Sequence, residues 1–218
     1  MSSPKIGFVG LGIMGRPMAL NLCAAGYPLH VYARRRESML PLQEVGAFAC
    51  SCPAEVAEAA DVVFVMVSDT PDVESVIFGA GGVAAAGKSG LIVVDMSTIS
   101  PVATRDMATR LMAKGMSMLD APVSGGEAGA IAGNLSIMVG GASEVFDRVL
   151  PLFQVMGKNI VHIGSHGAGQ VAKACNQITV GGAIAAVAEA MLFARENGAD
   201  PYKVRQALLG GFAGWQIR

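Results

Sequence analysis

A lysine and two amide side chains share one face of a helix that we expect in the last quarter of the chain. Lys173, Asn176 and Gln177 lie at positions i, i+3 and i+4 of an apolar segment. Burial of an ammonium group lowers its pKa toward the range in which it can transfer protons. Gly169, one turn earlier on that face, is expected to leave room for a ligand. The pattern predicts an acid–base group; the alternative is a lysine that reaches solvent or pairs with a carboxylate.

A second polar group is expected in a loop at the end of a strand. The loop reads Asp120-Ala121-Pro122-Val123-Ser124-Gly125-Gly126, with one proline and a pair of glycines. Such a loop can present the Ser124 hydroxyl and free backbone N–H groups to a carboxylate. We interpret it as a candidate carboxylate-binding loop.

A glycine-rich turn joins the first expected strand to the first expected helix. It reads Gly10-Leu11-Gly12-Ile13-Met14-Gly15. Gly10 permits the tight turn, Gly12 allows backbone to approach a pyrophosphate, and Gly15 allows close packing of helix on strand. The pyrophosphate then lies at the helix N-terminus, where N–H groups are unpaired. The turn predicts a dinucleotide site; the alternative is a tight turn with no ligand.

The end of the second expected strand favours one form of the dinucleotide. An acidic residue usually binds the ribose hydroxyls of NAD at this place, but the sequence has Ala33-Arg34-Arg35-Arg36, with no carboxylate before Glu37. A guanidinium group matches a 2′-phosphate well. We therefore expect NADP with Arg34 as its contact, and NAD stays possible. The alternative is a solvated basic turn.

Small polar residues follow two further strands. Ligands of open parallel sheets bind beyond the carboxyl ends of the strands, so these residues are candidates to border the nicotinamide and its ribose. The alternative is that Ser97 or Ser100 caps a helix. The candidates are Ser68, Ser97 and Thr98, together with Val67 at the end of the strand before Ser68.

Apolar runs alternate with helical patterns over the first three quarters of the chain. The runs are continuous rather than alternating, which indicates a parallel sheet covered on both faces. Ser100-Pro101 and Thr70-Pro71 are expected to cap helices. The expected strands are 6–9, 29–32, 62–67, 91–95, 116–119, 135–139 and 160–162. The expected helices are 14–25, 37–45, 53–59, 71–77, 101–114 and 144–156.

The pattern changes near Gly164. Residues 167–197 are expected to form one helix, and another begins after Asp200-Pro201. We predict an α/β dinucleotide-binding domain over 1–164 and the start of an all-helical domain over 165–218. A helix as apolar as the one over 167–197 must be buried by further helices or by a second subunit. We therefore predict a homodimer or homotetramer. We expect the natural protein to continue past Arg218.

Composition excludes several classes of protein. Hydrophobic residues make up 52% of 218 and charged residues 15%, which is typical of a chain with a sizeable core, and the net charge is −1. No nucleic acid or membrane surface is expected as a partner. The spacing of Cys50 and Cys52 is neither that of a zinc knuckle nor that of a C-x-x-C redox motif, so we expect reduced thiols and no metal. No signal sequence is apparent, and the uncharged stretch 174–188 is shorter than the roughly 20 residues of a membrane span. A cytoplasmic protein is expected.

Three motifs in this order resemble the β-hydroxyacid dehydrogenase family. They are Gly-Phe-Val-Gly-Leu-Gly-Ile-Met-Gly-Arg-Pro-Met-Ala at 7–19, Asp-Ala-Pro-Val-Ser-Gly-Gly at 120–126 and Gly-x-x-x-Lys-x-x-Asn at 169–176. The resemblance implies a Rossmann-type domain, an NAD(P) cofactor and a small semialdehyde or hydroxyacid substrate with a carboxylate. It implies that Lys173 is the general acid, that Ser124, Gly125, Gly126 and Gln177 hold the substrate, and that Asn176 fixes both Lys173 and a substrate hydroxyl.

Finer features resemble one branch of that family, the tartronate semialdehyde reductases. They are Gly126-Glu127, Asn176-Gln177 and the Ala213-Gly214 that follows Gly211-Phe212. The alternatives are a 3-hydroxyisobutyrate dehydrogenase and, from another class, a dinucleotide-binding module without catalysis. Two departures bear on activity and on cofactor choice. The later helices of the family, with a Lys-Asp pair that completes the pocket, are absent, and Ala33-Arg34 replaces the acidic residue of most such reductases.

Overall fold

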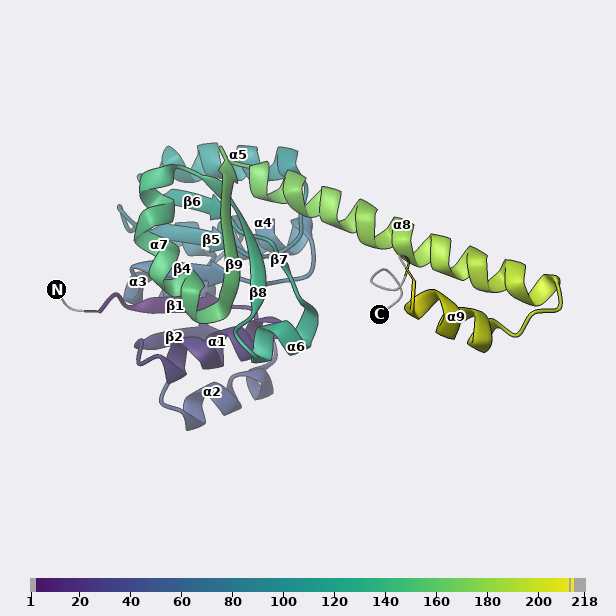
Figure 1. Cartoon of the computed structure of the whole chain (residues 1–218). Helices are drawn as coiled ribbons and strands as arrows, with labels where there is room; N and C mark the ends of the chain where they lie inside the picture. The colour runs from purple at the N-terminus through teal and green to yellow at the C-terminus, as the bar shows by residue number, and fades with distance from the viewer. Residues whose placement is uncertain (1–2, 212, 214–218) are drawn as a thin grey trace. The chain divides into compact units, whose positions relative to one another are not determined.

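The computed structural model describes residues 3–211 and 213 (Figure 1). These residues form two compact units, 1–173 and 174–218, and each is described by itself. The first unit carries a sheet with helices on both faces. The second consists of helices.

The sheet of the first unit has the strand order β3-β2-β1-β4-β5-β6-β8-β7, with β9 paired to β8. Neighbours from β3 to β6 are parallel. This is the order of a doubly wound Rossmann-type sheet, in which the chain reverses direction across the sheet between β1 and β4. The strands are β1 (Ile6–Val9), β2 (Leu29–Tyr32), β3 (Phe48–Ala49), β4 (Val62–Val65), β5 (Ile92–Asp95), β6 (Ser117–Asp120), β7 (Val123–Ser124), β8 (Leu135–Gly141) and β9 (Gly157–Gly164).

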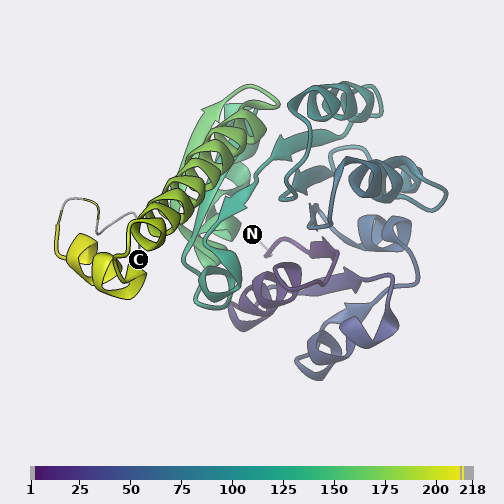
Figure 2. The same cartoon turned by 90° about the vertical axis from the view of Figure 1, so that its right-hand side faces the viewer.

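Two hydrophobic cores lie on the two faces of this sheet, because successive strand residues point to opposite sides. Phe8 and Phe64 stack in one core, together with residues of α1, α2, α6 and α7. Val63 and Val65 enter the other core, with residues of α3, α4 and α5. Figure 2 shows helices on both sides of the strands. The helices are α1 (Gly15–Ala24), η1 (Arg36–Ser38), α2 (Leu40–Glu44), α3 (Pro53–Ala59), α4 (Thr70–Phe78), η2 (Val83–Ala86), α5 (Pro101–Met112), α6 (Gly126–Ile131) and α7 (Ser143–Met156).

The far end of the sheet departs from the expected parallel arrangement. β8 pairs antiparallel with both β6 and β7, whereas β9 is parallel to β8. Four short elements, β3, β7, α6 and η2, were not predicted from the sequence. β3 and β7 have two residues each, which are too few for a strand pattern. Gly125 precedes α6, and Gly126 and Gly129 are among its first four residues, so helix propensity there is low.

Helix caps agree with expectation at one site and differ at another. The Ser100 side chain accepts a hydrogen bond from the backbone N–H of Ala103 and caps α5, as predicted. The cap of α4 is Asp69, whose carboxylate accepts from the N–H of Asp72, and not Thr70. Thr70 is already helical and instead accepts a hydrogen bond from the N–H of Ser100 through its hydroxyl.

Helix α8 (Ala168–Glu196) begins in the first unit and continues without a break into the second. α9 (Pro201–Leu209) follows, with Asp200 as its cap through a bond from the N–H of Tyr202. α8 has the length and composition of a membrane span, with a mean hydropathy of 1.6. One such helix is weak evidence for a membrane, since core helices of soluble proteins have the same properties.

Candidate active site

The glycine turn has the local geometry that each of its glycines was expected to permit. Gly10 has φ +98°, a backbone conformation that side chains rarely adopt, and its α-carbon lies close to the carbonyl of Met66. A β-carbon on Gly15 would collide with the carbonyl of Gly10 and would reach within 3.1 Å of the Phe8 ring. A β-carbon on Gly12 would meet no atom within 4 Å. Backbone at Gly12 is therefore open to a ligand.

A cavity of about 470 Å³ opens beside this turn, at the carboxyl ends of β1, β2 and β4. It lies where the strand order reverses, which is the usual ligand site of such sheets. Of the predicted cofactor contacts, it brings together Gly10, Leu11, Gly12, Arg34, Val67 and Ser68. Its lining does not include Ile13, Met14, Gly15, Ser97 or Thr98. Ile13 and Thr98 are nevertheless exposed.

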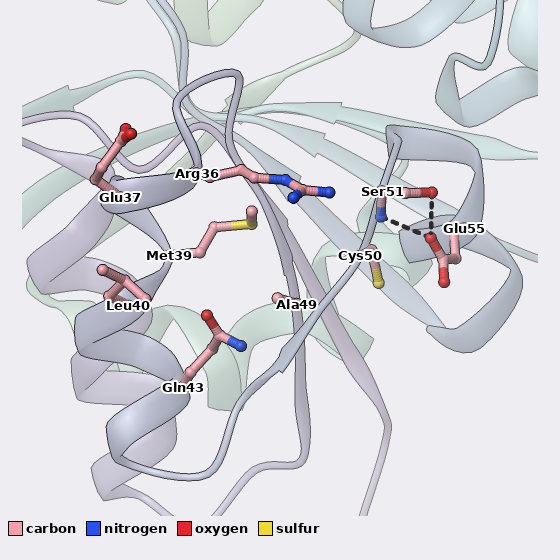
Figure 3. A pocket seen from close by; sticks show the side chains of 9 residues that line it. All are labelled: Arg36, Glu37, Met39, Leu40, Gln43, Ala49, Cys50, Ser51 and Glu55. Atoms are coloured by element: carbon pink, nitrogen blue, oxygen red, sulfur yellow. Dashed lines mark hydrogen bonds between the residues drawn. The ribbon is translucent and has the colours of Figure 1, made fainter.

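The three consecutive arginines are divided between two cavities. Arg34 and Arg35 line the cavity beside the glycine turn. Arg36 lines a separate cavity of about 430 Å³, where it extends toward Ser51 and Glu55 (Figure 3). The N–H and hydroxyl of Ser51 donate to the Glu55 carboxylate at 2.6 and 2.7 Å, and these bonds lower the pKa of Glu55. Only the first two arginines are placed for a ligand of the glycine turn.

Ser97 is fully buried, and its side chain joins the segments that follow β4 and β5 rather than capping a helix. Its hydroxyl accepts a hydrogen bond from the backbone N–H of Val67 at 3.0 Å. Its own N–H donates to the carboxylate of Asp95 at 3.0 Å. Asp95 is also fully buried, and its Oδ2 has no hydrogen-bond partner among the described residues. Burial, more than the nearby Asp120 charge, raises the pKa of Asp95 to about 7 despite the Ser97 bonds.

The Lys173 side chain is buried, with 8% of the residue's surface exposed. Within the described part of the chain, no carboxylate lies at ion-pair distance from its ammonium and no hydrogen bond is made by it. Burial lowers the pKa of Lys173 from its usual value. Among the described residues the structure thus gives Lys173 no acidic partner, which speaks against the alternative of an ion pair.

Gly169 does not leave room for a ligand, contrary to the expectation. A β-carbon there would collide with the carbonyl of Met138 and lie 2.9 Å from the Asp120 carboxylate. The glycine instead allows the first turn of α8 to pack directly on β6 and β8. Two further polar residues, Asp120 and Gln170, are buried at this junction, and neither was predicted as a site residue. Asp120 ends a strand and Gln170 begins a helix, but only the tertiary structure brings them together.

The Ser124 loop has the backbone conformations that its glycines allow. Ser124 is half-buried in β7 and pairs in register with Ser136 of β8. Gly125 and Gly126 have φ +136° and +62°, and both are exposed. Their N–H groups begin helix α6. The segment is thus a strand end followed by a helix N-terminus, which is a favourable place for an anionic group.

Asn176 and Gln177 belong to the second unit. Both lie in α8, so the helical spacing predicted for Lys173, Asn176 and Gln177 is present. The amide of Asn176 donates to Oε1 of Gln177 at 2.9 Å. Phe212 and Gly214 of the proposed branch signature lie outside the described residues.

Comparison with known proteins identifies the family. Residues 5–164 match the model of the NAD-binding domain of 6-phosphogluconate dehydrogenase. Residues 167–217 match the model described as the NAD-binding domain of NADP-dependent 3-hydroxyisobutyrate dehydrogenase.

Individual relatives agree with the family models. The chain is 52% identical to the 2-hydroxy-3-oxopropionate reductase of Escherichia coli, over 98% of this chain and 73% of the relative. It is 44% identical to the 3-hydroxyisobutyrate dehydrogenase of Pseudomonas aeruginosa, over 90% of this chain and 66% of the relative. A Mycobacterium tuberculosis 3-hydroxyisobutyrate dehydrogenase with L-serine has a TM-score of 0.87 at 33% identity, covering 97% of this chain and 72% of that one. The chain belongs to the β-hydroxyacid dehydrogenase family of NAD(P)-dependent oxidoreductases.

Proposed function

We propose that this protein reduces tartronate semialdehyde (2-hydroxy-3-oxopropionate) to glycerate, with NADPH as hydride donor and Lys173 as general acid. The observation that carries the proposal is the largely buried side chain of Lys173, whose charge no carboxylate of the described residues neutralises. A buried cation without a partner is costly, so a functional reason for it is needed. The 52% identity to a 2-hydroxy-3-oxopropionate reductase supports the choice of substrate.

The residues of the glycine turn fit a dinucleotide. The open backbone at Gly12 and the helix N-terminus behind it are suited to a pyrophosphate, and the cavity extends from there to Arg34 and Arg35. A guanidinium group at Arg34 would bind the 2′-phosphate of NADP, with NAD as the weaker alternative. When bound, the nicotinamide supplies the hydride. Val67 and Ser68 would border it. Ile13 and Met14 of the glycine turn, and Ser97 and Thr98 after β5, would be its further contacts.

Lys173 would donate a proton to the carbonyl oxygen of the substrate. Negative charge develops on that oxygen during reduction, and a nearby ammonium stabilises it before giving up a proton. The lowered pKa brings Lys173 closer to neutral pH, where a general acid works best. Asn176 would fix Lys173 and a substrate hydroxyl, and Gln177 would contact the substrate.

The substrate carboxylate would bind at the Ser124 loop. The Ser124 hydroxyl and the N–H groups of Gly125 and Gly126 lie at the start of α6, where the helix dipole favours an anion. This would hold the carbonyl in one orientation for hydride and proton transfer.

Replacement of Lys173 tests the mechanism. We expect Lys173→Ala to lower turnover by about 10² to 10⁴, the usual contribution of general-acid catalysis. The dissociation constant of NADPH, measured by fluorescence titration, should change less than about 2-fold because Lys173 does not line the cofactor cavity. A variant that keeps most of its turnover would remove Lys173 from the mechanism.

A substrate panel tests the specificity. Steady-state rates with NADPH and NADH should give the highest kcat/KM for tartronate semialdehyde, above methylmalonate semialdehyde. The second candidate, 3-hydroxyisobutyrate dehydrogenase, is favoured by the family model over 167–217 and by the relative from Pseudomonas aeruginosa. It would be preferred if methylmalonate semialdehyde were the better substrate. Tight NADPH binding without turnover on any small hydroxyacid or semialdehyde would instead indicate a binding module.

We further propose a soluble, cytoplasmic protein that acts as a homodimer or homotetramer, with no nucleic-acid or membrane partner. The net charge of −1 supports the absence of a nucleic-acid partner, and the similarity to bacterial reductases and dehydrogenases supports a soluble protein.

A further inference from the structure

We propose that Asp120 and Gln170 are positioning residues, which fix the first turn of α8 and thereby set the position of the Lys173 ammonium. The inference rests on the proposed role of Lys173 as general acid. It concerns the first unit alone, to which all three residues belong.

The Asp120 carboxylate binds the start of α8 with both of its oxygens. Oδ1 accepts from the backbone N–H of Gly167 at 2.8 Å, and Oδ2 accepts from the N–H of Gln170 at 3.0 Å. The first N–H groups of a helix have no partner within the helix, and a carboxylate also complements the positive end of the helix dipole. Asp120 is the last residue of β6, so it caps α8 from a strand that ends 47 residues before Gly167.

Two glycines give this carboxylate its place. A β-carbon on Gly140 of β8 would lie 2.6 and 2.8 Å from the Asp120 carboxylate oxygens. A β-carbon on Gly169 of α8 would lie 2.9 Å from Oδ2. The Asp120 carboxylate therefore lies against β8 and α8 at positions where neither element carries a side chain of its own. Such a close fit leaves the helix little freedom to shift.

The Gln170 side chain makes a second connection. It is buried, its Oε1 accepts from the N–H of Ile99 at 3.1 Å, and its Nε2 donates to the carbonyl of Ser97 at 2.8 Å. Ser97 in turn accepts from the N–H of Val67, which lines the cofactor cavity. Hydrogen bonds thus run from the wall of that cavity through Ser97 to Gln170, three residues before Lys173.

Lys173 has no anchor of its own among the described residues, so the helical turn that carries it sets the place of its ammonium. Displacement of a catalytic group by about 1 Å can lower the rate about 10²-fold. Loss of the Asp120 or Gln170 bonds should therefore act on turnover through Lys173, beyond any effect on stability.

The test uses two variants and one matched control in the full protein. Asp120→Asn keeps the shape but places an NH₂ group against a backbone N–H, and Gln170→Met keeps the length but removes both side-chain bonds. Ser100→Ala removes the side-chain cap of a different helix, α5. We expect the two variants to lower kcat about 10- to 100-fold, with the dissociation constant of NADPH within about 2-fold of wild type. The control should keep kcat within about 2-fold.

A double-mutant cycle separates positioning from a general structural effect. If Asp120 and Gln170 act through Lys173, neither variant should lower the residual turnover of Lys173→Met further. The positioning proposal alone is overturned if Lys173→Met is inactive while the folded Asp120→Asn and Gln170→Met variants match Ser100→Ala in kcat. It is also overturned if Asp120→Asn or Gln170→Met lowers the kcat of Lys173→Met by the same factor as it lowers the kcat of wild type. If Lys173→Met is as active as wild type, the proposed function fails first. Should Gln170→Met not fold, Gln170→Glu keeps the acceptor for Ile99, and the same criteria apply to it.

Discussion

Among single residues, Asp95 is the most unusual ionisable group of the sheet domain. It is fully buried at the end of β5, in register with Asp120 of β6, and one of its oxygens lacks a partner among the described residues. Its pKa is raised to about 7, chiefly by burial. The proposed mechanism gives it no proton to transfer, so its effect should appear in stability.

The free energy of unfolding should depend on pH through Asp95. Since its pKa is about 7 in the folded protein and about 4 in an unfolded chain, the folded state binds the proton more tightly. Stability is then lost as pH rises from about 4 through 7. Asp95→Asn cannot ionise, so urea unfolding between pH 5 and pH 8 should show a smaller loss, by about 1 to 3 kcal/mol. The exposed Asp147→Asn is the control, and equal slopes for Asp95→Asn and wild type would contradict the prediction.

The arginines beside the cofactor cavity give a second prediction for single residues. Arg34 lines that cavity, whereas Arg36 lines another, although the two are almost adjacent in sequence. Charge-assisted bonds to a phosphate contribute about 1.5 to 3 kcal/mol, so Arg34→Ala should raise KM for NADPH about 10-fold or more and leave KM for NADH nearly unchanged. Arg36→Ala should not alter the ratio of the two KM values. An unchanged ratio in Arg34→Ala would favour the solvated basic turn.

At the scale of elements, the contact between α8 and the strand ends depends on the absence of side chains. Gly169 belongs to a helix, where alanine is normally the more favourable residue by about 1 kcal/mol. A β-carbon at this position would collide with the carbonyl of Met138 and lie 2.9 Å from the Asp120 carboxylate. Tertiary packing therefore outweighs helix propensity at this position.

Gly169→Ala should accordingly destabilise the protein, by about 1 to 3 kcal/mol, as expected for overpacking. Ala172→Gly in the same helix is the matched comparison, since it lowers helix propensity by about 1 kcal/mol without adding atoms. Chemical denaturation of both variants measures the difference. A Gly169→Ala protein more stable than wild type would mean that propensity governs the turn and that the packing is loose.

For the molecule as a whole, the second unit exposes large apolar side chains. Ile178, Ile184 and Phe193 of α8 are 75%, 66% and 71% exposed in the single chain. Apolar surface of this kind usually marks an interface with another protein or subunit. The family relatives are longer than this chain, which covers 73% of the reductase from Escherichia coli.

Assembly should therefore be visible in solution. We expect sedimentation analysis to give the mass of a homodimer or homotetramer, and Ile184→Glu to shift it toward smaller species because a buried charge weakens an apolar interface. The exposed Gln206→Glu of α9 adds the same charge elsewhere and should leave the mass unchanged. A monomeric wild-type protein would contradict the proposed oligomer.

The sequence by itself determined features that depend on local backbone sterics. Gly10 has a positive φ, Gly15 packs on the carbonyl of Gly10, and Ser100 caps the helix that starts at Pro101. Each of these features involves residues only a few positions apart. Continuous apolar runs likewise placed the longer strands to within a few residues. The helical spacing of Lys173 and its neighbours followed from the same local periodicity.

Only the tertiary structure decided which distant residues meet. The direction of β8, the partition of the arginines between two cavities and the burial of Ser97 and Asp95 depend on long-range packing. So does the bond of Asp120 to a helix that begins about 50 residues later, which turned Gly169 from an expected ligand site into a packing position. Periodicity and turn chemistry report on neighbours along the chain, whereas these contacts arise when the sheet closes against the start of α8.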